Sequence, residues 1–328
     1  MLKNIVLGLL LIAIFLLTRQ MEPLFASQSS IGTMLRWTGL YGIMTIGAAF
    51  VIISGGIDLS IGSMIALIGA QFGILILEYD MNPYLAMVVV LTMAALIGLV
   101  YGLLITKLKL QPFVVTLCGL LVLRSIARYL TGDDMVSGFV VSDSGESLKY
   151  LTASKFWGLP LPLWMLGGVA MVAGVALNRT VFGRYLKALG NNEQAARYSG
   201  IQTDNVTIAA YIICSFLAGV TGILFAIDLG SVAPNTTGTF FELYAIAAAV
   251  LGGCSLRGGV GSIVGVLIGT AILRMLYQAI ETLRFAELEG TVIGVVILIG
   301  VIFDEIVRRV VANRRTKREM PIAPTETG

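Results

Sequence analysis

Residues 54–63 read Ser-Gly-Gly-Ile-Asp-Leu-Ser-Ile-Gly-Ser, and this stretch lies between two long apolar runs. It places a carboxylate, Asp58, inside a glycine-rich interruption of otherwise lipid-compatible sequence. Backbone at membrane depth leaves the helical conformation only where surrounding protein or a water-filled cavity satisfies its N–H and C=O groups. An ionisable side chain at such a place indicates function. The stretch therefore predicts a solute pathway rather than a passive anchor.

The composition predicts a polytopic membrane protein. The 328-residue chain is 57% hydrophobic and 12% charged, whereas a soluble domain carries about twice that charged fraction. The absence of histidine from the sequence excludes His-based proton relays, His metal sites and Ser-His or Cys-His catalysis. Cys118, Cys214 and Cys254 are too scattered for a metal cluster, so we expect small buried hydrophobic side chains. Neither a catalytic residue nor a cofactor is predicted.

Ten apolar runs are candidates for crossing a bilayer, which takes about 20 apolar residues in a helix. They are residues 3–18, 36–53, 61–79, 83–104, 112–131, 160–178, 206–228, 239–256, 259–280 and 290–307. The predicted fold class is an all-α, polytopic transmembrane bundle of about ten spans with broken helices. Residues 1–307 are expected to form the transmembrane domain, and residues 308–328 a basic cytoplasmic tail.

Lysine and arginine in short loops indicate the orientation, because they are enriched on the cytoplasmic side. The loop at 179–205 and the tail after 307 are basic and are predicted to lie inside. The connection at 132–159 is mainly acidic and is predicted to lie outside. Both termini are then inside. Arg19 and Arg36 lie on the outer side in this scheme and are the evidence against it.

A loose copy of the first stretch occurs at 252–262, which reads Gly-Gly-Cys-Ser-Leu-Arg-Gly-Gly-Val-Gly-Ser. Transporters are often built from structural repeats, and corresponding interrupted segments point toward the binding site. Glycine is also common in membrane helices simply because it lets them pack closely. Both interpretations stay open. Either one predicts tight helix contacts near Gly55, Gly56, Gly252 and Gly253.

The predicted cytoplasmic loop contains a candidate docking element. Residues 183–201 read Gly-Arg-Tyr-Leu-Lys-Ala-Leu-Gly-Asn-Asn-Glu-Gln-Ala-Ala-Arg-Tyr-Ser-Gly-Ile. The Gly-Asn-Asn turn also caps a helix, and the next six residues favour a short helix that Ser-Gly ends. A short helix with an Ala-Ala face suits a partner's groove, whereas a solvated connector is the alternative. The candidate docking residues are Gly190, Asn191, Asn192, Glu193, Ala195, Ala196, Gly200 and Ile201.

This string resembles the coupling loop of ribose-type ATP-binding-cassette (ABC) sugar importer permeases. Residues 54–63 are similar to the early signature of that family. Gln-Pro-Phe-Val-Val-Thr-Leu at 111–117, followed by Arg124, is similar to its middle segment, and Phe-Glu-Leu at 241–243 to its late one. The matches lie in order over about 40–270. Tyr244 is a departure, since the family often has Asp there, and so is the Ser that follows Arg124, where Gly is usual.

The resemblance implies the inner-membrane permease subunit of a bacterial monosaccharide importer, which alternates access and performs no covalent chemistry. It implies a separate cytoplasmic ATPase that pushes on the coupling loop, a periplasmic sugar-binding protein, and a second permease copy or sister permease. Membrane lipid surrounds such a protein, and no nucleic acid is involved. The chain itself has no Gly-x-x-x-x-Gly-Lys-Ser/Thr loop for nucleotide phosphates.

The charges inside the predicted spans are weighed one at a time. Asp58 either lines the path or fastens the broken helix by accepting backbone N–H bonds, and fastening is favoured because a neutral sugar needs no counter-ion. Arg124 is expected to pair within the bundle, and Glu242 to face the delivery protein or solvent. The pathway or broken-helix candidates are Gly55, Gly56, Asp58, Ser60, Arg124, Glu242, Tyr244, Gly252 and Gly253.

Aromatic residues in the spans have two interpretations. Tyr41, Tyr101 and Tyr244 could offer rings and hydroxyls to a sugar, or they could belong to the aromatic belts at the membrane interfaces. Two other functions compete with sugar import. A branched-chain amino-acid ABC permease shares glycine-rich breaks, and an ion-coupled secondary transporter could use Asp58 or Glu242 as its ion site. A purely structural membrane protein is disfavoured by the cost of keeping charges in spans.

Overall fold

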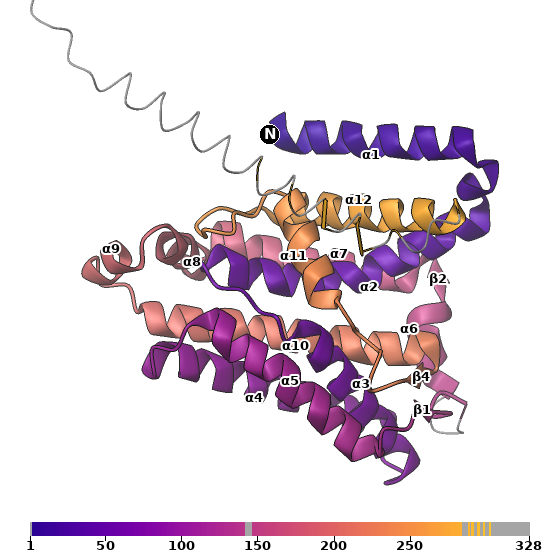
Figure 1. The fold of residues 1–328 in the computed structure, drawn as a ribbon, viewed down its shortest axis with the longest axis horizontal. Coiled ribbons are helices and arrows are strands. Elements are labelled where there is room, and N and C mark those ends of the chain that lie inside the picture. Colours follow the sequence, from indigo (N-terminus) through magenta and orange to yellow (C-terminus); the bar gives the residue numbers. More distant parts are fainter. Residues whose placement is uncertain are drawn as a thin grey trace, which may run out of the picture.

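A computed structural model describes residues 2–141 and 146–283, with isolated positions between 288 and 302. These residues form a helical bundle, which confirms the predicted fold class (Figure 1). The helices are α1 (Leu2–Met21), α2 (Gln28–Ile53), α3 (Ile61–Leu77), α4 (Pro83–Lys107), α5 (Pro112–Thr131), α6 (Tyr150–Ala153), α7 (Leu161–Arg179), α8 (Val181–Asn191), α9 (Glu193–Tyr198), α10 (Thr203–Leu229), α11 (Phe241–Leu251) and α12 (Ile263–Thr282). Two 3₁₀ turns cover Pro23–Ala26 and Glu146–Lys149.

Two short antiparallel strand pairs lie at one end of the bundle (Figure 1). Strand β1 (Val136–Ser137) pairs with β4 (Ser231–Val232), and β2 (Lys155–Phe156) pairs with β3 (Leu159–Pro160). Helices α8 and α9 lie at the opposite end of the bundle. In the predicted topology the strand end is therefore the outer end, and the α8–α9 end is cytoplasmic.

Six helices are long and apolar enough to cross a membrane, namely α2, α4, α5, α7, α10 and α12. With the shorter α1, α3 and α11, they coincide with nine of the ten predicted spans within the described residues. The tenth span, 290–307, and the tail 308–328 lie almost wholly outside the described residues. One predicted boundary was wrong at the start of α2, because Ser27 caps this helix and Ser30 N–H donates to its Oγ at 3.2 Å.

The predicted span 239–256 was also too long, because α11 is a half-length helix. A residue in the left-handed region, Phe240 (φ 64°), precedes it, and Gly253 (φ 96°) turns the chain after its end. Eleven residues rise about 16 Å, roughly half the hydrocarbon thickness. Non-helical backbone, mostly turns, must therefore complete this crossing.

Helices α2 and α10 form the centre, and α4, α5 and α7 expose most of their surface. Glycines allow the close contacts there. A β-carbon at Gly98 of α4 would stand 2.6 Å from the Tyr211 carbonyl oxygen of α10, and one at Gly222 of α10 would stand 2.9 Å from the Ile65 oxygen of α3. The exposed apolar faces of α4, α5 and α7 suit contact with lipid.

Two re-entrant segments enter the bundle from opposite ends (Figure 1). After α2 ends near α8, residues 54–60 turn back into the interior, where α3 begins. After α10 ends near the strands, residues 230–240 turn back into the interior, where α11 begins. The two helix starts touch, because a β-carbon at Gly62 would contact the Gly238 oxygen and lie 2.5 Å from Glu242 Oε2. Of the two predicted glycine-rich breaks, only the one at 54–60 belongs to this facing pair, because residues 252–262 lie at the α8 end, between α11 and α12.

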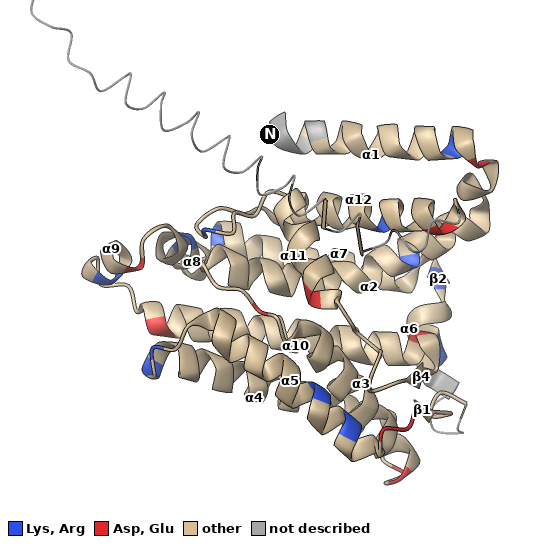
Figure 2. Cartoon of the chain, viewed as in Figure 1, with Lys and Arg blue, Asp and Glu red and all other residues tan. Residues whose placement is uncertain are grey.

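An ion pair accounts for one of the two residues that argued against the predicted topology. Arg36 Nη1 lies 3.0 Å from Asp228 Oδ1, and the Asp228 side chain is only 2% exposed. A buried carboxylate with a cationic partner explains an arginine at the outer end without reversing the chain. Lysine and arginine also occur on α8 and α9 and near the adjoining end of α4 (Figure 2). The orientation itself stays a prediction.

Candidate functional site

Three segments meet backbone to backbone at Gly190 of α8, at a point that we name the glycine junction. The first segment contributes Ile53 and Gly55, the second Gly190, and the third Gly258 and Gly259. The Gly259 N–H donates to the Ile53 oxygen at 2.9 Å. A β-carbon at Gly190 would collide with that oxygen and with Gly259 N. One at Gly258 would stand 2.7 Å from the Gly190 oxygen and 2.9 Å from Gly55 Cα. The docking loop and the two glycine-rich copies are therefore in direct contact.

The other predicted glycines also serve close approach. A β-carbon at Gly56 would stand 2.5 Å from the Tyr211 hydroxyl, and one at Gly252 would stand 2.5 Å from the Gly265 carbonyl carbon of α12. Gly253 ends α11 with a positive φ. The two copies differ in context, since 54–60 leads into the interior start of α3 and 252–262 leads into α12 from the α8 end. A repeat relating them stays a prediction.

Helix α9 has the predicted bounds. Asn192 caps it by accepting from Ala195 N–H at 2.9 Å, and Gly200 (φ 82°) follows its end. The predicted Ala-Ala docking face is correct for Ala195, which is exposed, and wrong for Ala196. Ala196 is only 5% exposed, because it packs against the rest of the permease. Tyr198, which the sequence analysis did not single out, is 91% exposed on this helix. It lies three residues after Ala195, a spacing that shares a helix face.

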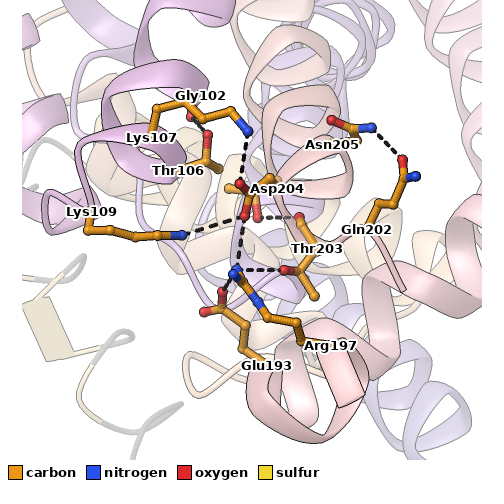
Figure 3. A network of polar contacts seen from close by, with 11 residues as sticks. Gly102, Thr106, Lys107, Lys109, Glu193, Arg197, Gln202, Thr203, Asp204 and Asn205 are labelled. Carbon is orange, nitrogen blue, oxygen red and sulfur yellow. Dashed lines mark hydrogen bonds and ion pairs between the residues drawn. The ribbon is translucent and has the colours of Figure 1, made fainter. Parts of the chain in front are cut away.

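The base of α9 is held by a polar network (Figure 3). Arg197 Nη2 donates to Glu193 Oε1 within α9 and to Asp204 Oδ1 at the start of α10, each at 2.9 Å. Asp204 also pairs with Lys107, the last residue of α4, at 3.0 Å and with Lys109, just after α4, at 3.5 Å. One exposed pair contributes about 0–1 kcal/mol, but a shared carboxylate fixes three elements together. Asn191 and Ile201, which flank α9, are exposed and half-buried respectively.

Asp58 is enclosed by protein, with 3% of its surface exposed. Its Oδ1 accepts from the Ser60 N–H at 2.8 Å and from the Ser60 hydroxyl at 2.7 Å. The Thr116 hydroxyl of α5 donates to the Ile57 oxygen at 3.2 Å. The broken segment thus has its polar groups satisfied by neighbouring protein, as membrane depth requires. This geometry fits the fastening hypothesis for Asp58.

Arg124 and Glu242 hold the other re-entrant segment. Arg124 Nη1 donates to the Pro234 oxygen at 3.0 Å and to the Thr237 oxygen at 2.6 Å. Arg124 therefore has partners within the bundle, as expected, and these partners are backbone carbonyl oxygens. The expectation that Glu242 is solvated or faces a delivery protein was wrong, because it is 7% exposed and lies beside Gly62 at the start of α3. A helix N-terminus favours a carboxylate.

The three candidate tyrosines separate into two places. Tyr41 and Tyr244 lie edge to face with ring centroids 5.9 Å apart. Tyr101 lies elsewhere, on α4, where a β-carbon added to Gly119 of α5 would stand 2.7 Å from its ring. Tyr244, the departure from the family pattern, is thus part of an aromatic cluster in the interior. The sequence offered no signal that would pair it with Tyr41.

The cysteine prediction holds for two of the three residues. Cys214 and Cys254 are buried, but Cys118 is exposed on the outward face of α5. Within the described residues, groups of three or more His, Cys, Asp and Glu side chains that could hold a metal ion are absent. The described arrangement consists of close backbone contacts, buried polar side chains that hold the re-entrant segments, and an aromatic interior.

Comparison with known proteins gives this architecture a family. Residues 30–301 match the family "Branched-chain amino acid transport system / permease component". The chain belongs to this permease family. It is 37% identical to the ribose import permease protein RbsC of Escherichia coli K12 over 304 residues, which cover 92% of each protein. It is 35% identical to the protein of the same name from Bacillus subtilis 168, over 87% of each.

A further relative is the L-arabinose transport system permease protein AraH of Escherichia coli K12, which is 32% identical over 80% of this chain and 78% of the relative. No solved structure matches the chain. The matches and the apolar helices together make this permease a multi-pass protein of a bacterial inner membrane.

Proposed function

We propose that this permease is the membrane-spanning subunit of an ABC importer for a monosaccharide. Its relatives over nearly the full length are a ribose and an L-arabinose permease. The observation that carries the proposal is the glycine junction, because it joins α8, at the end predicted to be cytoplasmic, directly to both glycine-rich segments. Force applied to α8 and α9 reaches the interior through backbone contacts.

The partners follow from this arrangement. A separate cytoplasmic ATPase docks on the exposed face of α9, where Ala195 and Tyr198 lie, and a periplasmic sugar-binding protein delivers substrate to the strand end. A second permease copy or a sister permease completes the pathway. The permease performs no covalent step itself. The network around Asp204 links α9 to the start of α10 and to the end of α4, so that a push on α9 is passed to both helices.

Inside the membrane, the buried charges fasten the re-entrant segments. Asp58 and Ser60 secure the start of α3, and Arg124 secures residues 234–237 before α11. Because these charges are engaged by protein, they fit a neutral cargo. The alternative cargo is a branched-chain amino acid, which the name of the matching family mentions. A zwitterion would call for balanced charges along the path.

Uptake of labelled substrates tests the cargo. The permease would be produced with the ATPase and binding protein encoded beside it, in a host that lacks its own ribose and arabinose importers. We expect uptake of a monosaccharide from a panel that includes D-ribose and L-arabinose, dependent on ATP and on the permease. Uptake of L-leucine without any sugar of the panel would contradict the proposal and support the amino-acid alternative.

Docking is tested by a matched pair of substitutions. Ala195→Glu changes an exposed position, so we expect a normal melting temperature, loss of uptake and weaker co-purification of the ATPase. Ala196→Glu changes a buried position and should lower the melting temperature, since a buried unpaired charge is costly. Unchanged uptake in Ala195→Glu would mean that α9 is only a connector.

A further inference from the structure

We propose that Arg274 and the aromatic rings around it form the floor of a monosaccharide-binding site that opens toward the strand end of the permease. The inference rests on the proposed function and names a site for its cargo. The side chains come from three elements: Trp37 and Tyr41 from α2, Tyr244 from α11, and Arg274 and Tyr277 from α12. We name these five residues the aromatic floor.

The aromatic floor is built around the guanidinium group. The Arg274 Cζ atom lies 4.7 Å from the Tyr41 ring centroid, 5.1 Å from that of Tyr277 and 5.3 Å from that of Trp37. Tyr244 contacts both tyrosines, with centroids 5.9 Å from Tyr41 and 4.9 Å from Tyr277. Arg274 is only 8% exposed. Ring faces stabilise a cation in such a place.

Two cavities adjoin the aromatic floor and share Tyr41, Arg274 and Tyr277. The larger has a volume of about 400 Å³ and is also lined by Thr33, Trp37, Gln278 and Glu281, on the outer halves of α2 and α12. The smaller, of about 10 Å³, lies against Tyr244 and the deeper residues Thr45, Ala248 and Thr270. The three shared side chains therefore lie between the larger cavity, which we name the outer chamber, and a deeper void with room for at most about one water molecule.

The lining of the outer chamber suits a sugar. Small-molecule sites are concave, mostly apolar or aromatic, and have volumes of about 300–1,000 Å³ with a few placed polar groups. The C–H face of a sugar ring packs on aromatic faces, and its hydroxyl edge needs donors and acceptors. A guanidinium group carries its N–H donors in a fixed plane, and Arg274 brings that plane to the wall of the cavity. Gln278 and Glu281 add acceptors at the outer rim.

The position of the aromatic floor suits a step on the way inward. Tyr244 lies in the first turn of α11, the helix that begins where the two re-entrant segments meet. A sugar in the outer chamber would thus rest one layer of side chains away from that meeting point.

Trp37 provides a direct reporter, because the chain has three tryptophans and the other two lie outside this site. Trp157→Phe with Trp164→Phe leaves Trp37 alone in the full-length permease, which would be placed in lipid nanodiscs. The probes are D-ribose, L-arabinose and any other sugar that the uptake experiment identifies. We expect a saturable change in Trp37 emission. The matched control, Trp37→Phe with Trp164→Phe, keeps only the exposed Trp157 and should not respond.

Arg274→Lys in the Trp37-only permease tests the central residue. Lysine keeps the charge but loses the planar set of donors, so we expect sugar affinity to fall by about tenfold. Arg128→Lys, at an exposed arginine outside this site, is the matched control and should leave the Trp37 response unchanged. Melting temperatures show that each variant is folded. An unchanged affinity in folded Arg274→Lys would overturn the assignment of Arg274.

The failure of this inference differs from the failure of the proposed function. If the Trp37-only permease takes up a sugar but Trp37 emission does not respond to it, the aromatic floor is only a packed core and the inference is wrong, while the proposed function stands. If no sugar is taken up and L-leucine is, the proposed function fails and the inference fails with it.

Discussion

Both re-entrant segments return the chain to the interior of the bundle, where a helix begins, but different contacts hold the two segments in place. Residues 54–60 are held by backbone contacts at the glycine junction, where β-carbons on the facing Gly190 and Gly258 would have no room, and by a carboxylate that accepts from its own neighbour. Residues 230–240 contain proline, asparagine and threonines and are held by the guanidinium of Arg124. The inner segment should therefore be sensitive to added volume, and the outer segment to the loss of one side chain.

The largest effect is expected at the glycine junction. Gly190→Ala adds a carbon that would collide with the Ile53 oxygen and Gly259 N, which are backbone atoms with little freedom to move. Overpacking costs about 1–3 kcal/mol, and we expect a lower melting temperature in detergent and loss of uptake. Gly167→Ala in α7 is the control, because its β-carbon would meet no atom within 4 Å. Equal behaviour of the two variants would refute the junction as a tight contact.

The next largest effect is expected at the outer segment. Arg124→Met keeps much of the side-chain volume but removes the donor to the Pro234 and Thr237 oxygens. An unsatisfied buried polar group costs about 1–3 kcal/mol, so melting temperature and uptake should both fall. Arg124→Lys should recover part of the loss, since one ammonium group can still donate to carbonyl oxygens. If Arg124→Met is as stable as the native permease, the segment is held by other contacts.

Asp58 should show a smaller and graded effect. Asp58→Asn keeps an acceptor for the Ser60 N–H and should preserve much of the stability and uptake. Asp58→Ala leaves that donor unsatisfied at about 1–3 kcal/mol, and should lower melting temperature and uptake together. A stable Asp58→Asn permease without uptake would overturn the fastening role and favour an ion-coupled transporter. Thermal melting and labelled uptake of both variants separate these outcomes.

The smallest effect is expected for Arg128, which lies one turn after Arg124 on α5 and forms an exposed ion pair. Arg128 Nη2 lies 2.6 Å from Asp133 Oδ2, just outside α5, and this hydrogen bond lowers the pKa of Asp133 below its usual 3.8. A lowered folded-state pKa stabilises the protein above the unfolded pKa, and the contribution disappears as pH falls through the folded value. Arg128→Met should therefore change the melting temperature slightly at neutral pH and not at strongly acid pH. If Arg128→Met lowered the melting temperature as much as Arg124→Met does, the distinction between the exposed ion pair and the buried fastening by Arg124 would be wrong.

Local features of the fold could be predicted from the sequence. The interruption at 54–60, the bounds of α9 and its Asn192 cap follow from turn and capping chemistry within a few residues. The half-length of α11 was missed because the small residues after it, Gly-Gly-Cys-Ser at 252–255, are compatible with a membrane helix, and hydropathy does not record where non-helical backbone is tolerated. That tolerance depends on neighbours far away in the chain.

Long-range partners could not be predicted for the same reason. Arg124 donates to oxygens 110 and 113 residues away, and nothing in a single sequence pairs an arginine with backbone carbonyls. Ala196 and Ala195 are equivalent as residue types, and only the packing of α9 decides which one is buried. The meeting of Tyr41, Tyr244 and Arg274 likewise depends on how α2, α11 and α12 pack.

The glycine junction has a consequence for how the permease moves. Side chains that interdigitate must change rotamers before two helices can translate past one another, and such steps add barriers. Gly190, Gly55 and Gly258 present bare backbone to each other, so a displacement of α8 along this contact requires no rotamer change. The three segments cannot move closer together, because their backbone atoms already touch, but they can slide past one another with little resistance. The hydrogen bond from Gly259 N–H to the Ile53 oxygen is the interaction that such a displacement would have to break.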